Sequence, residues 1–258
     1  MVKEIPMHLI FKRWLMVLLM TVVVLLNGCA SSQSTASSSS TNSASNPASP
    51  LESIAGATKE GTKQPRLDGN ATVDLIVKGG TITIEVDGKN APVTAGNFVD
   101  LVQKGVYNGS AFHRVVRQPE PFVVQGGDPQ SKDPKVPIEQ LGTGGYIDPA
   151  TGQTRYVPLE IKPAGATKPV YGKTLEAAGI SNPPQLRHYR GAVAMARSTY
   201  PDSASSQFYI TLADVNFLDG NYAVFGKVTN GMEIVDKIQQ SDRIESAKVT
   251  AGLENLKT

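Results

Sequence analysis

The stretch TVDLIVKGGTITIEV, residues 72–86, marks the folded part of this chain as a β structure. It holds two runs rich in β-branched residues, Thr72 to Val77 and Thr81 to Val86, and Lys78-Gly79-Gly80 joins them. Such runs favour strands, and glycines between two strands favour a tight turn. We therefore predict a β-hairpin over residues 72–86.

Further short strands and two helices are predicted after the hairpin. Thr94 is expected to cap a helix that runs through Lys104, and a second helix is expected from Met232 to Gln240. The further strands are predicted at Ala111 to Val116, Phe122 to Gln125, Gly191 to Ala196, Gln207 to Leu212, Ala223 to Val228 and Lys248 to Leu253. Many short strands with two helices favour a closed antiparallel β-barrel over a βαβ fold.

One long segment, residues 129–189, is too long for a plain loop in a compact domain. It contains Gly, Pro and Thr clusters, a predicted short strand at Tyr156 to Ile161 and a predicted helical turn near Leu175 to Ala178. We predict that this segment, called the excursion below, is structured and leaves from one edge of the barrel.

The N-terminus has the pattern of a processing signal. Lys12-Arg13 precedes an apolar run from Trp14 to Leu26, and about 13 apolar residues suit a signal-peptide core better than a membrane span. Leu26-Asn27-Gly28-Cys29 then resembles the bacterial lipobox, in which a small residue precedes a lipidated cysteine. An uncleaved signal anchor is the alternative interpretation, and either Met1 or Met7 is the start.

The predicted domain organisation follows from this leader. Residues 1–28 form a lipoprotein signal peptide, residues 29–66 hold the lipidated Cys29 and a disordered Ser-rich linker, and residues 67–258 form the folded domain. Half of positions 31–50 are serine, and such a segment buries too little apolar surface to offset its ordering entropy. We therefore expect an extracytoplasmic lipoprotein that is anchored to a membrane and faces the periplasm or the cell surface.

Composition narrows the function classes. The chain has 25 basic and 23 acidic residues, and the first 28 positions hold three basic and one acidic, which leaves 22 of each. This balance gives no electrostatic reason to expect a nucleic-acid partner. One cysteine and three histidines argue against an internal disulfide and against a metal cluster built from these residues. We expect no metal and no cofactor.

Three segments in collinear order carry a family resemblance. They run from Ala111 to Val116 with Phe122 to Asp128, from Gly191 to Ala196 with Ser206 to Ile210, and from Phe217 to Gly220 with Val224 to Val228. Together with Ala91 to Phe98, they resemble the cyclophilin-type peptidyl-prolyl cis-trans isomerases, here in a bacterial lipoprotein form. The resemblance implies a mainly β fold: a closed antiparallel eight-stranded barrel with two capping helices and a long inserted loop region.

The resemblance also implies the site residues. The catalytic arginine of the family and its glutamine neighbour fall on Arg114 and Gln125. The substrate-binding positions of the family fall on Phe122, Val123, Ala196, Arg197, Gln207, Tyr209, Phe217, Leu218 and Tyr222.

Several of these positions depart from the eukaryotic pattern of the family. The departures are Val123 for a methionine, Tyr209 for a phenylalanine, Arg197 for an asparagine, Tyr222 for a histidine and Phe217 for a tryptophan. Arg197 brings a long charged side chain to a place where the substrate backbone is expected. Phe217 in place of the rim tryptophan predicts only weak binding of cyclosporin.

An arginine suits the implied chemistry for a physical reason. Amide resonance opposes rotation about an X-Pro bond with a barrier of about 18–20 kcal/mol, and no bond has to be broken. In the twisted amide the prolyl nitrogen regains a lone pair that accepts a hydrogen bond. A guanidinium is a permanent donor, so Arg114 can bind the twisted amide more strongly than the planar one.

Two functions stay open at the level of sequence. The first is an isomerase that acts on X-Pro bonds of extracytoplasmic proteins and assists their folding. The alternative is a non-catalytic chaperone or assembly module that binds Pro-containing segments, since Arg197 or the excursion could narrow the groove. Both take Pro-containing peptide segments of client proteins as partners.

Overall fold

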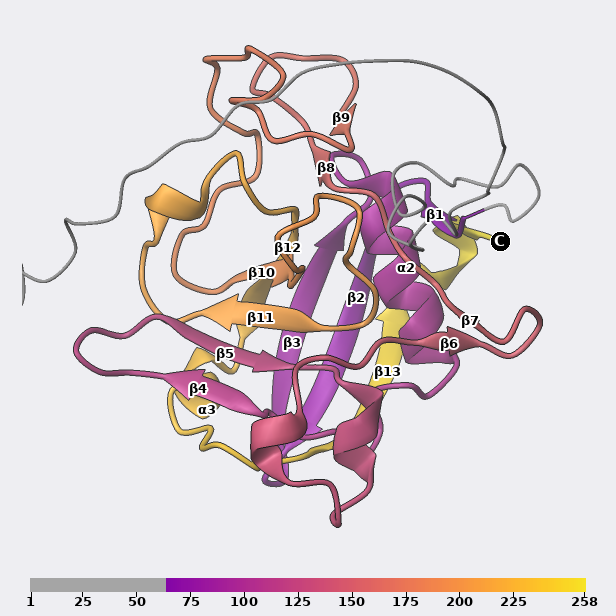
Figure 1. Ribbon diagram of the computed structural model, residues 1–258, viewed down its shortest axis with the longest axis vertical. Coiled ribbons are helices and arrows are strands. Elements are labelled where there is room, and N and C mark those ends of the chain that lie inside the picture. The colour runs from indigo at the N-terminus through magenta and orange to yellow at the C-terminus, as the bar shows by residue number, and fades with distance from the viewer. Residues whose placement is uncertain (1–63) are drawn as a thin grey trace, which may run out of the picture. The chain divides into compact units, whose positions relative to one another are not determined.

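The computed structural model describes residues 64–258, and an eight-stranded antiparallel sheet forms their centre (Figure 1). The strand order is β13-β2-β3-β12-β10-β11-β5-β4. The strands are β2 (Asn70–Val77), β3 (Gly80–Asp87), β4 (Arg114–Val116), β5 (Val123–Gly126), β10 (Ala192–Met195), β11 (Phe208–Thr211), β12 (Val224–Asn230) and β13 (Ile244–Ala251). The mainly β fold with eight antiparallel strands is confirmed.

Smaller elements surround this sheet. The two-stranded pairs are β1 (Arg66–Leu67) with β14 (Leu256–Lys257), β6 (Ile147–Asp148) with β7 (Gln153–Thr154), and β8 (Glu160–Ile161) with β9 (Val170–Tyr171). The helices are α2 (Pro92–Gln103) and α3 (Met232–Val235), and the 3-10 helices are η1 (Pro129–Lys132), η2 (Ile138–Gln140), η3 (Asn216–Leu218) and η4 (Leu253–Asn255).

The predicted hairpin over residues 72–86 is confirmed. Strands β2 and β3 pair in register from Asn70 with Asp87 to Val77 with Gly80. The turn residues Lys78 and Gly79 have φ angles of 53° and 70°, which is the left-handed conformation that a two-residue hairpin turn requires. Side chains alternate between buried and half-buried along β2, so one face of the hairpin lies against the core.

The sheet is curled. Strands β4, β5 and β11 lie across the direction of β2 and β3 in Figure 1. Backbone hydrogen bonds join the segments that lead into the edge strands β4 and β13: the Phe112 N–H donates to the Asp242 carbonyl at 2.8 Å, and the Ile244 N–H donates to the Ser110 carbonyl at 2.8 Å. Full closure of the barrel along these two strands stays a prediction.

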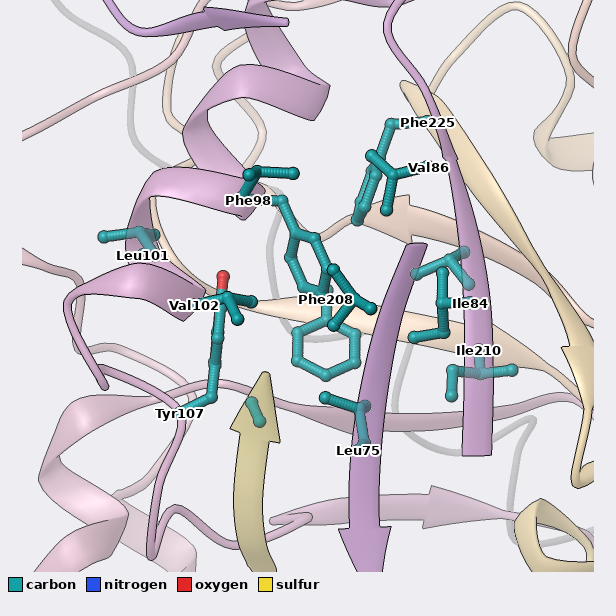
Figure 2. Packing of buried hydrophobic residues seen from close by; sticks show 14 of the residues in the cluster. Leu75, Ile84, Val86, Phe98, Leu101, Val102, Tyr107, Phe208, Ile210 and Phe225 are labelled. Atoms are coloured by element: carbon teal, nitrogen blue, oxygen red, sulfur yellow. The ribbon is translucent and has the colours of Figure 1, made fainter. Parts of the chain in front are cut away.

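The main core lies between α2 and the inner face of the sheet (Figure 2). Phe98 of α2 stands at its centre, and its ring centroid lies 5.2 Å from that of Tyr107, 5.4 Å from Phe208 and 4.9 Å from Phe225. Full burial of each such side chain contributes about 1.5–3 kcal/mol. These aromatic contacts hold α2 against β11 and β12.

The prediction that Thr94 caps the first helix was wrong. Helix α2 begins at Pro92, and Thr94 lies buried inside its first turn. The N–H groups of Val93 and Thr94 instead donate to the carboxylate of Glu160 in β8, at 3.2 and 2.7 Å. A residue of the excursion therefore supplies the cap that the local sequence does not.

The second helix is shorter than predicted. Helix α3 ends at Val235, and the chain continues in tighter turns in which the Lys237 and Ile238 N–H groups donate to the Ile234 and Val235 carbonyls at 2.9 and 3.2 Å. The guanidinium of Arg117 also donates to the carbonyls of Val235 and Ile238, at 3.2 and 2.8 Å. The last long strand also differs, since β13 begins at Ile244 rather than at Lys248. Two register shifts in its pairing with β2 interrupt the alternation that would reveal a strand in the sequence.

The excursion is structured, as predicted. Its predicted strand is realised as the short β8, and its predicted helical turn closes with the Ala178 N–H on the Thr174 carbonyl at 3.0 Å. Its residues Leu159, Ile161 and Leu175 form an apolar cluster with Ala223, which directly precedes β12.

The structure does not describe the leader. The predicted signal peptide, the lipidation site Cys29 and the linker up to residue 63 lie outside the described residues. Within residues 64–258, no helix combines the length and apolar character that a membrane crossing needs.

Candidate functional site

Arg114 begins β4 and lies opposite Gln125 of β5 in the strand register. The Arg114 Nη1–H donates to Gln125 Oε1 at 3.3 Å. The guanidinium carbon also lies 5.6 Å from the ring centroid of Phe122, within the range of a cation–π contact. A hydrogen bond and an aromatic face thus orient a guanidinium that is exposed to solvent.

A series of hydrogen bonds between side-chain amides holds Gln125, the partner of Arg114, in place. Gln125 Nε2–H donates to Gln207 Oε1 at 3.1 Å, and Gln207 Nε2–H donates to the Gly144 carbonyl at 2.7 Å. Each amide uses its nitrogen toward Gly144 and its oxygen toward Arg114. The orientation of both amides is therefore determined by the hydrogen bonds, and their oxygens point toward the positive charge.

The loop that ends this series of hydrogen bonds is held by a buried carboxylate. Asp128 Oδ2 accepts from the N–H groups of Gly142 and Gly144 at 2.7 and 3.1 Å. A Cβ at Gly144 would lie 2.2 Å from Asp128 Oδ1, so only glycine fits. The sequence analysis missed the role of Asp128 and Gly144, although the run Gly142-Thr143-Gly144-Gly145 is a local signal for such a loop.

An apolar cluster lies beside Arg114. Its buried members are Val123, Ala192, Ala194, Tyr209 and Val224, and its half-buried members include Phe122, Ala196, Leu218 and Tyr222. Phe217 of η3 stacks on Phe122 with ring centroids 5.8 Å apart and is 71% exposed. The fold therefore brings together the apolar residues that the sequence predicted for substrate binding.

Arg197 is tied to the protein itself. Its Nε and Nη2 donate to the Asn221 carbonyl at 3.1 and 2.8 Å, and its Nη1 donates to the Ser198 carbonyl at 2.9 Å. Its guanidinium carbon lies 4.7 Å from the ring centroid of Tyr222. These contacts fix the charged end of Arg197 against Asn221 and Tyr222, at one end of the apolar cluster.

His113, next to Arg114 in sequence, is buried. Its ring nitrogens have no hydrogen-bond partner within the described part of the chain, and burial lowers the pKa of His113 below its usual value. A neutral, buried imidazole suits a structural role for His113. No group of three or more His, Cys, Asp or Glu side chains in residues 64–258 is arranged to hold a metal ion.

Comparison with known proteins places this chain in a family. The family model described as cyclophilin type peptidyl-prolyl cis-trans isomerase/CLD matches residues 72–255. A protein of Synechocystis sp. named as a thylakoid lumen peptidyl-prolyl cis-trans isomerase is 42% identical over 202 residues, which cover 74% of this chain and 50% of that protein. A chloroplastic peptidyl-prolyl cis-trans isomerase of Arabidopsis thaliana is 41% identical over 216 residues, which cover 77% of this chain and 46% of that protein.

The chain spans about half the length of these two relatives. Peptidyl-prolyl cis-trans isomerase A of Dickeya dadantii is 36% identical over 175 residues, which cover 64% of this chain and 70% of that protein. Among solved structures, a cyclophilin-type isomerase of Cryptosporidium parvum, crystallised in the presence of the dipeptide Ala-Pro, matches with a TM-score of 0.51 and 24% identity over 70% of this chain and 99% of that chain. This likeness bears on the fold alone.

Proposed function

We propose that this chain, which belongs to the cyclophilin-type peptidyl-prolyl cis-trans isomerase family, accelerates rotation about X-Pro peptide bonds. The observation that carries the proposal is the position of Arg114: its oriented guanidinium lies over the ring of Phe122, which packs against an apolar cluster. The reaction makes and breaks no covalent bond, so these side chains suffice for it.

The cluster and the guanidinium have separate tasks. Phe122, Val123, Tyr209 and Leu218 present apolar surface to the prolyl ring, while Arg114 donates to the prolyl nitrogen as it becomes pyramidal. Because that lone pair exists only in the twisted amide, the hydrogen bond is stronger in the transition state than in the ground state. Each 1.36 kcal/mol of such differential binding is about tenfold in rate.

The remaining predicted residues are assigned to the parts of the bound peptide outside the prolyl ring and to the rim of the site. Ala196 and Gln207 lie on neighbouring antiparallel segments, where the Ala196 N–H donates to the Gln207 carbonyl at 2.9 Å. We assign the backbone of the bound peptide to this side of the cluster, together with Arg197. Phe217, stacked on Phe122 at the rim, covers the prolyl ring from outside.

Replacement of Arg114 tests the proposal. Arg114→Ala is expected to lower kcat/KM in a protease-coupled peptide assay at least tenfold, which is about 1.4 kcal/mol, while the far-UV circular dichroism spectrum stays unchanged. Lys248, exposed on β13, offers a matched control, since Lys248→Ala removes a positive charge from a strand that carries none of the proposed site residues and should leave the rate unchanged. An Arg114→Ala protein as fast as the wild type would refute the assignment.

A non-catalytic Pro-peptide-binding module is the second candidate, and Arg197 favours it. Its guanidinium occupies the end of the cluster where the family has a smaller side chain, so it could restrict the twisting of a bound peptide. NMR exchange spectroscopy on an X-Pro peptide separates the two functions. Binding without any acceleration of cis-trans exchange by the wild type would establish the module and refute the isomerase.

We further propose that the domain works outside the cytoplasm, on a lipid anchor at Cys29, and assists the folding of exported proteins. The lipobox and the Ser-rich linker support this, as do the two relatives whose names place them in the thylakoid lumen and the chloroplast. Cys29→Ser is expected to abolish incorporation of labelled palmitate and to move the protein from the membrane to the soluble fraction. Unchanged labelling would contradict the proposal.

Cyclosporin is a further proposed ligand, with weak affinity. Phe217 offers a smaller apolar face than the tryptophan that the eukaryotic pattern carries there, and it has no ring N–H to donate. Titration calorimetry with the wild type measures this affinity directly, and tight, nanomolar binding would contradict the proposal.

A further inference from the structure

The hydroxyl of Tyr209 has a partner that the proposed reaction does not use. Tyr209 lies on β11, opposite Ala194 of β10 and Gln125 of β5, and its ring is a buried member of the apolar cluster, only 5% exposed. Its hydroxyl oxygen lies 2.9 Å from Nε2 of His188. The phenylalanine of the family's eukaryotic pattern has no hydroxyl and could not make this contact.

His188 is fully buried, and both of its ring nitrogens are engaged. Nδ1 lies 2.8 Å from Asp219 Oδ1, and the backbone N–H of His188 donates to the same oxygen at 2.9 Å. The rings of His188 and Tyr209 are nearly parallel, 13° apart, with centroids 6.0 Å from each other. His188 therefore links Tyr209 to Asp219 directly.

The protons in this link have one consistent arrangement. A carboxylate can only accept, so His188 Nδ1 carries a proton and donates it to Asp219. The neutral imidazole then has a lone pair on Nε2, and the Tyr209 hydroxyl donates to it. Burial lowers the pKa of His188 and raises the pKa of Tyr209, so both groups are held in the neutral forms that this arrangement needs.

The same histidine also holds η3, the 3-10 helix at the rim of the cluster. The Val215 N–H, immediately before η3, donates to the His188 carbonyl at 2.8 Å. Asp219, immediately after η3, accepts from the His188 backbone and ring. Both ends of the segment that carries Phe217 and Leu218 are therefore bound to His188, and its imidazole is bound to the floor of the cluster at Tyr209.

We propose that His188 is a positioning residue of the substrate site, which holds the rim segment η3 at a set distance from Tyr209 so that the prolyl ring is gripped between them. The inference rests on the proposed function. His188 is buried and touches no substrate; it acts through Tyr209, Phe217 and Leu218. The hydrogen bonds that orient Arg114 run through Gln125, Gln207 and Gly144 and include none of these residues.

Because the hydrogen bonds of His188 and those of Arg114 involve different residues, we expect loss of the His188 link to change KM and not kcat. Loss of the His188 link loosens the grip on the prolyl ring equally in the planar and the twisted amide, which raises KM and leaves kcat nearly unchanged. His188→Ala is expected to raise KM at least fivefold with kcat within twofold of the wild type. Tyr209→Phe, which keeps the ring and removes only the hydroxyl, is expected to raise KM by a smaller factor.

Acid should have the same effect as these substitutions. The groups that face the imidazole are Asp219 after η3 and Tyr209 on β11, with Tyr222 and Arg197 beyond Tyr209. A protonated His188 presents an N–H to the Tyr209 hydroxyl, whose own proton then faces apolar side chains that cannot accept it. KM should therefore rise as pH falls through the titration of His188, and this rise should be weaker in Tyr209→Phe, in which the link is already absent.

The test uses the full-length protein, with Tyr156→Phe as the matched control. Tyr156 is 54% exposed and lies in the excursion, so its hydroxyl should not affect KM at any pH. If His188→Ala fails to fold, the KM of Tyr209→Phe and the pH dependence of KM in the wild type still test the proposal. An unchanged KM in Tyr209→Phe over the whole pH range, or a fall in kcat at constant KM, would overturn the proposal.

Nitrogen-15 NMR of the histidine rings tests the link without reference to activity. The chain has only three histidines, so the resonances of His188 can be assigned by substitution. We expect an Nδ1-protonated ring at neutral pH whose Nε2 shift moves in Tyr209→Phe. The Nε2-protonated tautomer, or a shift that ignores Tyr209→Phe, would refute the inference alone. An inactive wild type with the expected shifts would instead refute the proposed isomerase, and peptide affinity would then replace KM as the readout.

Discussion

Arg114 is one exposed residue in a three-residue strand, and its neighbours make it distinctive. The strand register places it opposite Gln125, which accepts a hydrogen bond from the guanidinium. Gln125 is in turn held by Gln207, and Gln207 by the Gly144 carbonyl. An isolated surface arginine samples many rotamers, whereas the guanidinium of Arg114 is oriented by a chain of hydrogen bonds through Gln125, Gln207 and Gly144.

Replacement of Phe217 should change the affinity for cyclosporin without disturbing the core. It is 71% exposed and stacks on Phe122, so a larger ring can be accommodated there without repacking the core. Phe217→Trp is expected to tighten cyclosporin binding about three- to tenfold, from the larger aromatic face and the added ring N–H. Titration calorimetry measures the affinities of both proteins.

The control for this experiment is Tyr156→Trp, a comparable change at an exposed site in the excursion. The tryptophan introduced by Phe217→Trp can also report binding by its fluorescence, since the only tryptophan of the natural sequence is Trp14 in the leader. An affinity for cyclosporin that is the same with Phe and Trp at position 217 would contradict the explanation.

At the scale of elements, the contact between the excursion and α2 has the clearest energetic meaning. The Glu160 carboxylate is buried, accepts from two N–H groups at the start of α2, and accepts from the Tyr171 hydroxyl at 2.7 Å. Burial and the neighbouring Glu160 raise the pKa of Tyr171 to about 12, so this hydroxyl stays a donor. The excursion is thereby part of the folded unit and not an appendage.

Removal of this carboxylate should destabilise the domain. Glu160→Ala leaves the N–H groups of Val93 and Thr94 and the Tyr171 hydroxyl without their acceptor, at a cost of about 2–4 kcal/mol in the free energy of unfolding. Glu160→Gln keeps one acceptor oxygen and should cost less. Urea denaturation measures both, with the exposed Glu176 of the excursion replaced by Ala as the control. Equal stabilities of the two Ala variants would show that the cap contributes nothing.

At the scale of the whole molecule, two buried histidines predict how stability depends on pH. Burial lowers the pKa values of His113 and His188 in the folded state, whereas both take the usual value of about 6.5 when the chain unfolds. Below that pH the unfolded chain binds protons that the folded chain does not, so the free energy of unfolding falls as pH falls. Their contribution is complete above about pH 6.5 and is lost toward the lower pKa values of the folded state.

Urea denaturation at pH 7 and pH 5 checks this prediction. The free energy of unfolding should decrease on acidification, by at most about 1.4 kcal/mol per pH unit for each histidine. The variant with both His113→Gln and His188→Gln should show a smaller decrease. A stability that rises toward pH 5, or a decrease of the same size in the variant, would be inconsistent with buried neutral histidines.

Local sequence patterns predicted the hairpin correctly, but they did not predict the cap of α2 or the length of α3. The β-branched runs and Gly79 predicted the hairpin because strand preference and turn geometry are properties of neighbouring residues. The cap of α2 was missed because its acceptor, Glu160, lies 66 residues from Thr94 in sequence. Helix α3 was predicted too long: the chain after Val235 forms tighter turns and is held by Arg117, which donates to the carbonyl of Ile238, 121 residues away in the sequence.

The sequence by itself determined the antiparallel β character, the order of the strands along the chain, the family and the residues proposed for the substrate site. Each of these depends on residue types at fixed spacing, which the chain carries before it folds. Only the tertiary structure decided that Arg197 is tied to Asn221, that Glu160 caps α2, and that His188 joins Tyr209 to both ends of η3. These contacts join residues that are far apart in the sequence, and their hydrogen bonds form only where the folded chain brings a donor and an acceptor within about 3 Å.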